Sequence, residues 1–174
     1  MESEAGAAIA IQNISGLAQS PDIPRLRGLC RQFLAPIPVP CTLSVVLVND
    51  QQIAAMNRQY LEREGPTDVI AFSLLRGAAG DYFTIPGKQA PYAYTASAQP
   101  QGPPLLLGEI YLSLEQALAY AQSERTSLDH ELAFICVHGP LHLVGYQDNT
   151  QATKREMIDT ATFFLQTVEG AKRS

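Results

Sequence analysis

The order of strand-like and helix-like patterns along the chain constrains its fold more than any other feature of the sequence. Segments rich in β-branched residues, which are typical of strands, alternate with segments whose apolar residues recur at helical spacing. This order predicts an α/β fold in which helices pack on one small mixed sheet of about four strands. We expect strands at Ala7–Asn13, Thr42–Val48, Thr67–Leu75 and Leu105–Leu114, and helices at Pro21–Ala35 (capped by Ser20), Gln51–Leu61, Glu115–Glu124, Leu128–Val144 and from Asn149 or Thr150 to about Val168.

One long segment interrupts this pattern. Arg76–Pro104 contains nine glycines or prolines and three charged residues among its 29 residues, and no strand or helix period runs through it. A loop of this length is uncommon inside a compact domain. We therefore expect an extended hairpin or a mobile flap, inserted at about residues 76–104 into a single domain that spans residues 1–174. Two interpretations of the segment remain: it is an unordered linker, or it is a flap that lies over a cleft.

The composition excludes several classes of protein. Of the 174 residues, 46% are apolar and 17% are charged, which supplies a core and argues against disorder. The 12 basic and 17 acidic residues give a net charge of −5, so any contact with RNA must be local rather than a broad basic face. Apolar runs such as Leu132–Val137 are too short to span a membrane, and the acidic start Met1–Glu4 is unlike a secretory signal. We expect a cytoplasmic protein without a membrane partner, whose cysteines (Cys30, Cys41 and Cys136) are buried free thiols.

Two histidines and an aspartate have the spacing of a metal site. His138 and His142 are four residues apart, on one face of the expected helix. Gly145 can turn the chain three residues later, and Asp148 can then return a carboxylate to the same ion. Two imidazoles and one carboxylate leave an open coordination position for water, whose pKa a divalent ion lowers. The alternative is that the histidines are core residues with satisfied hydrogen bonds; His130, two turns earlier, is interpreted as a near-cap or surface residue.

The residue that follows the first histidine separates two classes of metal hydrolase. Zinc peptidases with a related spacing carry a general-base glutamate at this position. This chain has Gly139 instead, which cannot accept a proton. Peptide hydrolysis is therefore disfavoured, and hydrolysis of a phosphodiester, where a metal ion and substrate positioning suffice, is favoured. Another zinc hydrolase remains an alternative.

The segment around the histidines also matches a longer motif. His138-Gly-x-Leu-His142-Leu-x-Gly-Tyr146 resembles H-G-x-L-H-L-x-G-Y-D-H, the signature of the YbeY family, bacterial endoribonucleases of ribosomal RNA maturation. The resemblance extends from about Thr42 to the C-terminus, with the insertion between its parts. Further segments match the family in order and spacing: Met56–Tyr60 followed by Pro66–Phe72, then Leu107–Ser113, then Glu131–Ala133.

The resemblance implies a fold, an activity and partners. The fold would be a single zincin-like α/β domain, and the activity that of a cytoplasmic, single-strand-specific endoribonuclease. Such an enzyme processes the 3′ end of small-subunit ribosomal RNA and acts in ribosome quality control. His138 and His142 match the first two of three zinc ligands in the family. The implied partners are ribosomal RNA and the small ribosomal subunit, with a small-subunit ribosomal protein and the GTPase Era.

The sequence departs from the family pattern at presumed functional positions. The third ligand position holds Asp148 in place of histidine, and its oxygen broadens the range of fitting ions from zinc to other divalent transition metals. The family arginine that follows the motif tyrosine is Leu61 here. We expect Arg58 and Arg63 to be the catalytic arginines that supply the phosphate contacts in its place, although each can equally belong to a solvated helix face.

Two other departures concern the backbone and the sheet. Pro140 lies between the two histidines, removes the helix hydrogen bond to the carbonyl of Cys136, and favours a kink there. Glu109 replaces the aspartate of a family strand motif. The departures at Leu61 and Asp148 leave a second hypothesis open, a diverged ribosome-associated binding protein whose nuclease activity is weak or lost.

Overall fold

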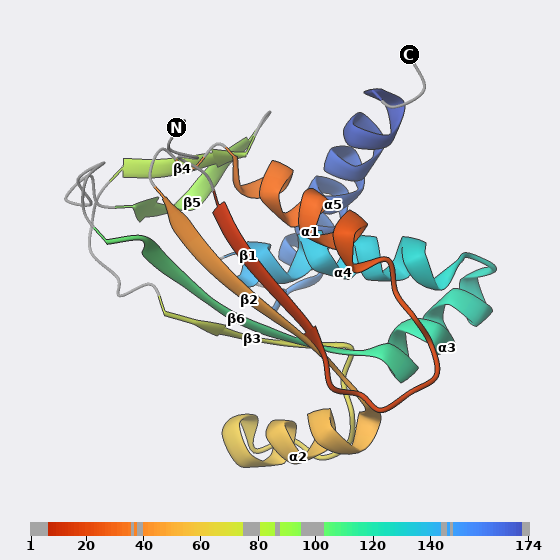
Figure 1. The fold of residues 1–174 in the computed structure, drawn as a ribbon. Helices are drawn as coiled ribbons and strands as arrows, with labels where there is room; N and C mark the ends of the chain where they lie inside the picture. Colours follow the sequence, from red (N-terminus) through yellow and green to blue (C-terminus); the bar gives the residue numbers. More distant parts are fainter. Residues whose placement is uncertain are drawn as a thin grey trace.

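The chain folds around a four-stranded sheet that separates two unequal layers of helices (Figure 1). A computed structural model describes residues 7–35, 37, 40–74, 81–85, 88–94, 103–143, 146 and 148–171. The strands are β1 (Ala7–Asn13), β2 (Cys41–Val48), β3 (Val69–Ser73), β4 (Asp81–Ile85), β5 (Lys88–Tyr94) and β6 (Leu105–Ser113). The helices are α1 (Ile23–Leu34), α2 (Asp50–Leu61), α3 (Leu114–Glu124), α4 (Leu128–Leu143) and α5 (Gln151–Ala171).

The sheet is mixed, as the sequence predicts. Its strands lie in the order β1-β2-β6-β3, with the first three parallel and β3 antiparallel to β6. The register between β2 and β6 shifts where Thr42 pairs with Leu106 and Leu43 pairs with Gly108, which leaves Leu107 as the extra residue of a bulge. A bulge bends its strand and increases the local twist. Here it lies in the half of β6 over which the end of α4 packs.

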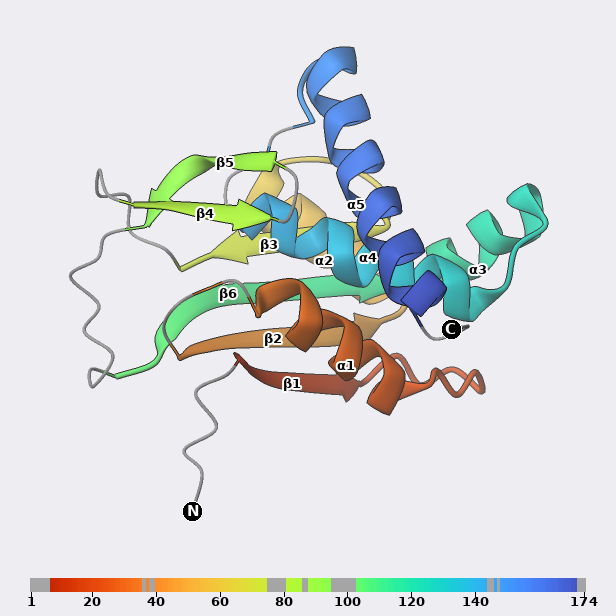
Figure 2. The ribbon, with the colours of Figure 1, turned by 90° about the horizontal axis from the view of Figure 1, so that it is seen from above.

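Helices α1, α4 and α5 cover one face of the sheet, and α2 lies on the other (Figures 1 and 2). The main core forms between the sheet and helices α1, α4 and α5. Its fully buried side chains include Val45, Ile110, Leu132 and Cys136. Under α2 lies a second, smaller cluster of Val46, Val48, Ile53 and Ile70. All three cysteines are free and buried, which confirms the prediction. None of the helices in the described part of the chain is long and apolar enough to cross a membrane.

Short polar side chains begin the helices and fix their boundaries. Asn49 and Gln52 form a reciprocal capping box at the start of α2, with bonds of 2.8 and 2.9 Å. The expected cap Ser20 is wrong for α1, because Asp22 accepts a hydrogen bond from the amide of Arg25 at 3.0 Å and the helix starts directly after it. Thr150 accepts from the amide of Thr153 at 3.1 Å and so begins α5.

The insertion contains an antiparallel hairpin of β4 and β5. Figure 1 shows it on the same side of the four-stranded sheet as α1, α4 and α5. This confirms the extended hairpin that the sequence predicts for part of residues 76–104. The expected flap over a cleft concerns residues 76–80 and 95–102 as well, which lie outside the described residues.

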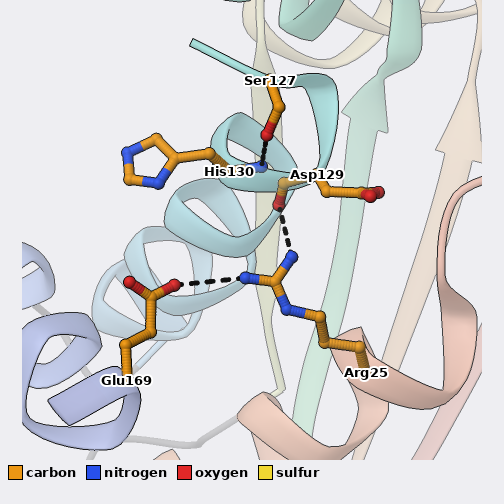
Figure 3. A network of polar contacts seen from close by, with 5 residues as sticks. All are labelled: Arg25, Ser127, Asp129, His130 and Glu169. Carbon is orange, nitrogen blue, oxygen red and sulfur yellow. Dashed lines mark hydrogen bonds and ion pairs between the residues drawn. The ribbon is translucent and has the colours of Figure 1, made fainter. Parts of the chain in front are cut away.

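One polar network ties the ends of three helices together (Figure 3). Arg25 of α1 forms an ion pair with Glu169 of α5 at 3.2 Å and donates to the backbone carbonyl of Asp129 in α4 at 3.5 Å. Beside it, the amide of His130 donates to the hydroxyl of Ser127 at 3.1 Å, while the His130 side chain is exposed. His130 is therefore a near-cap surface residue, as predicted, and the network fixes the start of α4.

Candidate metal centre

Helix α4 presents two imidazoles on one face. His138 and His142 lie one turn apart, and their ring centroids are 5.0 Å from each other with the ring planes at 77°. Phe134, a further turn towards the N-terminus, stacks on the ring of His138 at 5.6 Å and 27°. Sequence reasoning missed Phe134, although its position four residues before His138 is the signal that would have found it. Three consecutive turns thus build one continuous ring cluster.

The environment of His138 keeps its imidazole neutral. Burial, together with the charge of His142, lowers the pKa of His138 from its usual 6.5 to about 4, although the carboxylates of Asp68 and Asp148 act in the opposite direction. The Nδ1 atom of this ring is buried and has no hydrogen-bond partner among the described residues. A neutral imidazole is the form that binds a metal ion. His138 therefore presents a nitrogen whose lone pair or proton is unused within the described fold.

The sheet under α4 fixes the place of the histidines. Gly139 faces Ile110 of β6, and a Cβ atom at this position would stand 3.0 Å from the Ile110 side chain. Residue 139 therefore points into the core, so the general-base glutamate of zinc peptidases would not fit here. At the end of the helix the Ser73 hydroxyl donates to the carbonyl of Leu143 at 3.1 Å. Ile110 and Ser73 thus hold the helix at Gly139 and at Leu143, the residues that follow His138 and His142.

Asp68 contributes charge rather than a contact. Its Oδ1 accepts hydrogen bonds from the amide of Val69 at 2.9 Å and from the hydroxyl of Thr67 at 3.1 Å. Its carbonyl accepts from the amide of Ser113 at 2.9 Å, which ties the start of β3 to the end of β6. The carboxylate is thus held by one backbone amide and one hydroxyl, and its negative charge reaches His138.

The structure brings two of the three expected ligands together. Asp148 is exposed, and its charge acts on His138, but in the described part of the chain no group of three histidine, cysteine or acidic side chains is arranged to hold a metal ion. The expected turn at Gly145 lies outside the described residues. The donor types nevertheless fit a divalent transition metal, because two imidazoles and a carboxylate are its ordinary ligands and the Nδ1 of His138 has no other partner. Coordination by Asp148 stays a prediction.

The expected arginines lie on the other side of the sheet. Arg58 is exposed on α2, the helix that covers the opposite face from α4, and Arg63 is exposed just beyond the end of α2 (Figure 1). The described residues show no contact between either arginine and the histidines. Leu61, which stands where the resemblance implies an arginine, is 44% exposed. Glu109 lies on this second face too, where its Oε2 accepts a hydrogen bond from the hydroxyl of Tyr111 at 3.1 Å.

Comparison with known proteins settles the family. A sequence profile described as endoribonuclease YbeY matches residues 22–169. The chain belongs to the endoribonuclease YbeY family. The family that the resemblance indicated is therefore confirmed.

Individual relatives agree with this assignment. The chain is 34% identical over 116 residues to an endoribonuclease YbeY of Bacillus licheniformis, a match that covers 67% of this chain and 65% of the relative. It is 35% identical over 127 residues to an endoribonuclease YbeY of a Picosynechococcus strain, covering 73% and 68%. The matches thus span about two thirds of these relatives' lengths. The solution structure of TM1509 from Thermotoga maritima has the same α/β fold, with a TM-score of 0.55, 22% identity, and coverage of 95% and 92%.

Proposed function

We propose that this chain is a metal-dependent endoribonuclease that cleaves single-stranded RNA in ribosomal RNA maturation, at the 3′ end of the small-subunit RNA, and in ribosome quality control. Its YbeY relatives carry the name endoribonuclease. The observation that carries the proposal for this chain is the buried, unpartnered Nδ1 of His138 beside the ring of His142. Such a nitrogen costs stability in the absence of a ligand and gains a partner when one binds.

We assign one zinc ion, or another divalent transition metal, to His138, His142 and Asp148. When bound, such an ion supplies Lewis-acid chemistry and activates water for attack on a phosphodiester. His138 contributes a neutral imidazole, since its pKa lies well below neutral pH. Phe134 limits the rotation of that ring by stacking on it. Asp148 contributes a negative charge that offsets part of the charge of a divalent ion.

The two arginines are assigned to the RNA backbone. Arg58 and Arg63 are exposed cations on the α2 side of the sheet. Because α2 and α4 lie on opposite faces, these guanidinium groups would bind phosphates away from the scissile bond rather than the reacting phosphate itself. An RNA strand that reaches both the arginines and the histidines would pass around the edge of the sheet formed by β3. Such contacts position a substrate without contributing to bond cleavage.

The wider setting follows from the same proposal. Residues 1–174 form one hydrolase domain with the insertion at about 76–104, and a continuous core that joins the sheet to α1, α4 and α5 supports this. The partners are ribosomal RNA and the small ribosomal subunit, with a small-subunit ribosomal protein and the GTPase Era, and the place of action is the cytoplasm. The net charge of −5 favours binding to RNA that is assisted by such partners.

A metal and cleavage assay with a matched histidine control tests the proposal. The purified protein is expected to contain about one transition-metal ion per chain and to cleave a single-stranded oligonucleotide but not its duplex. His142→Ala should lose the metal and at least about a hundredfold in cleavage rate. His130→Ala is the control, because it removes an exposed histidine from the same helix. Full cleavage by His142→Ala would refute the assignment.

A second function, that of a ribosome-associated binding protein with weak nuclease activity, is favoured by one observation. Leu61 places an exposed apolar side chain where the resemblance implies an arginine. This function predicts co-sedimentation with small ribosomal subunits that survives a chelator, together with cleavage that stays near background after metal is added. Loss of co-sedimentation on chelation would count against it.

A further inference from the structure

Helix α4 contains a proline between its two histidines, yet it is continuous from Leu128 to Leu143. Pro140 has no amide hydrogen, so the carbonyl of Cys136, four residues earlier, receives no helix hydrogen bond from it. Cys136 and Pro140 are both buried, and water does not reach this carbonyl freely. A buried carbonyl without a donor destabilises a fold by about 1–3 kcal/mol. A donor from another element would satisfy the carbonyl that Pro140 leaves without its usual helix partner.

Cys30 of α1 supplies that donor. Its Sγ atom lies 3.5 Å from the carbonyl oxygen of Cys136, and the two residues are 106 positions apart in the sequence. Both cysteines are fully buried at the contact between α1 and α4. A thiol is a weak donor with an otherwise apolar body, so it can occupy a core position and still serve one carbonyl.

We propose that Cys30 is a positioning residue for the histidine pair, and that its thiol replaces the hydrogen bond removed by Pro140. The carbonyl of Cys136 begins the turn that ends at Pro140, and this turn carries His138 and leads into His142. Fixing the carbonyl therefore fixes the direction in which the two imidazoles leave the helix. The effect of this positioning on metal binding rests on the proposed function. The contact between Cys30 and the Cys136 carbonyl does not depend on it.

A purely structural role, in which Cys30 only fills space in the core, predicts a different dependence on side-chain chemistry. Cys30→Val fills the site with a slightly larger apolar side chain and removes the donor, and Cys30→Ser keeps a donor with a smaller side chain. Cys41→Val is the matched control, because Cys41 is a buried free thiol in β2 and not in the α1–α4 contact. If only packing matters, Val replaces Cys30 better than Ser does; if the donor matters, the order is reversed.

The first measurement uses metal-free protein and NMR. Carbonyl-labelled cysteine combined with amide-labelled valine gives one cross-peak, that of the Cys136–Val137 peptide, because no other cysteine precedes a valine. Cys30→Val should shift this carbonyl resonance and the side-chain resonances of His138 and His142, and Cys30→Ser should restore them. Cys41→Val should leave all three in place. Unchanged histidine resonances in Cys30→Val would overturn the proposal.

The second measurement uses the proline itself. Pro140→Ala returns an amide hydrogen to position 140, which can then bond the Cys136 carbonyl within the helix. Cys30→Val should therefore shift the histidine resonances in the chain with Pro140 and leave them unchanged in the Pro140→Ala chain. Equal effects of Cys30→Val in the two backgrounds would refute the link between Cys30 and Pro140.

Zinc titration then connects the contact to the proposed metal centre. Cys30→Val should weaken zinc binding about five- to tenfold, since loss of an indirect support costs less than loss of a direct partner of a ligand. Cys30→Ser should bind within about twofold of the unchanged chain. If the unchanged chain binds no zinc or other divalent metal, the proposed function fails, while the NMR comparison still decides whether Cys30 positions the histidines. Equal zinc affinity in Cys30→Val and the unchanged chain would overturn the proposal.

Discussion

The two faces of the sheet differ in how completely they are covered. On one face α1, α4 and α5 form a continuous core in which His138 and His142 are placed by contacts to β3 and β6. On the other face α2 covers only a small cluster, and the rest of the strands line an open hollow of about 360 Å³. Exposed apolar side chains gather on this second face: Tyr60, Leu61, Leu74 and Leu106.

Under the proposed function, this difference separates the metal centre on the covered face from RNA contacts on the other face. The covered face can hold an imidazole neutral and fix its direction, because burial and close packing restrict it. The other face has an accessible aromatic series, in which the rings of Tyr60, Phe72 and Tyr111 meet edge to face at 5.3 and 5.9 Å. Two departures from the family pattern, Leu61 and Glu109, also lie there. Changes on the first face should therefore alter stability and metal binding, and changes on the second should alter RNA binding.

The largest loss of stability is expected from a substitution at Gly108, where the covered face leaves no space for a side chain. Gly108 has a φ of +151°, and a Cβ atom there would stand 2.2 Å from the Phe72 carbonyl oxygen and 2.8 Å from Leu143. Gly108→Ala must displace either β3 or the end of α4, so we expect a loss of more than about 3 kcal/mol in the free energy of unfolding. Urea denaturation measures this loss.

Gly28 provides the matched control for that substitution. It lies inside α1, and a Cβ atom there meets nothing within 4 Å. Gly28→Ala should stabilise the protein by about 0.5–1 kcal/mol, because alanine is the better helix former. Similar effects of the two substitutions would show that the contact between Gly108, β3 and α4 does not fix the histidine helix.

A smaller effect on the same face depends on pH. The pKa of His138 lies near 4 in the folded protein and near 6.5 in the unfolded chain. Between these values the unfolded chain binds a proton that the folded protein does not, so stability is present above pH 6.5 and is lost as the pH falls towards 4. In metal-free protein the free energy of unfolding should fall by less than roughly 3 kcal/mol over this range, because the ring is partly exposed to solvent.

Denaturation of chelated protein at a series of pH values measures this dependence. His138→Gln should flatten the curve between pH 6.5 and 4, since glutamine does not titrate there. His130→Gln should leave the curve unchanged, because His130 is exposed at the start of the same helix. A curve that keeps its full slope in His138→Gln would assign the acid sensitivity to other groups.

The sequence predicted local features of both faces well. Features that depend on residues within a few positions of each other were predicted: the order of strands and helices, the spacing of His138 and His142, and the helix hydrogen bond to the Cys136 carbonyl that Pro140 removes. The Cys30 thiol that serves this carbonyl is far away in the chain, so no local pattern indicated it. The place of Arg58 and Arg63 depends on which face α2 covers, and helical periodicity does not determine that choice. Asp148 follows residues outside the described part of the chain, and its role as a ligand stays a prediction.

The smallest effect on stability, and the clearest on RNA binding, is expected from Leu61→Arg. Leu61 ends α2 with 44% of its surface exposed, so the change should alter the free energy of unfolding by less than about 0.5 kcal/mol. One added phosphate contact should raise affinity for single-stranded RNA about three- to tenfold at low salt. It should also make the slope of log K against log salt concentration more negative by about 0.7. Binding is measured in the His142→Ala background, which separates it from cleavage. Leu106→Arg adds the same charge to the hollow on this face, where Leu106 is 57% exposed. An equal gain from both variants would mean that added charge alone strengthens binding, whereas a gain from Leu61→Arg alone would locate the RNA contact at α2, beside Arg58 and Arg63 and across the sheet from the histidines.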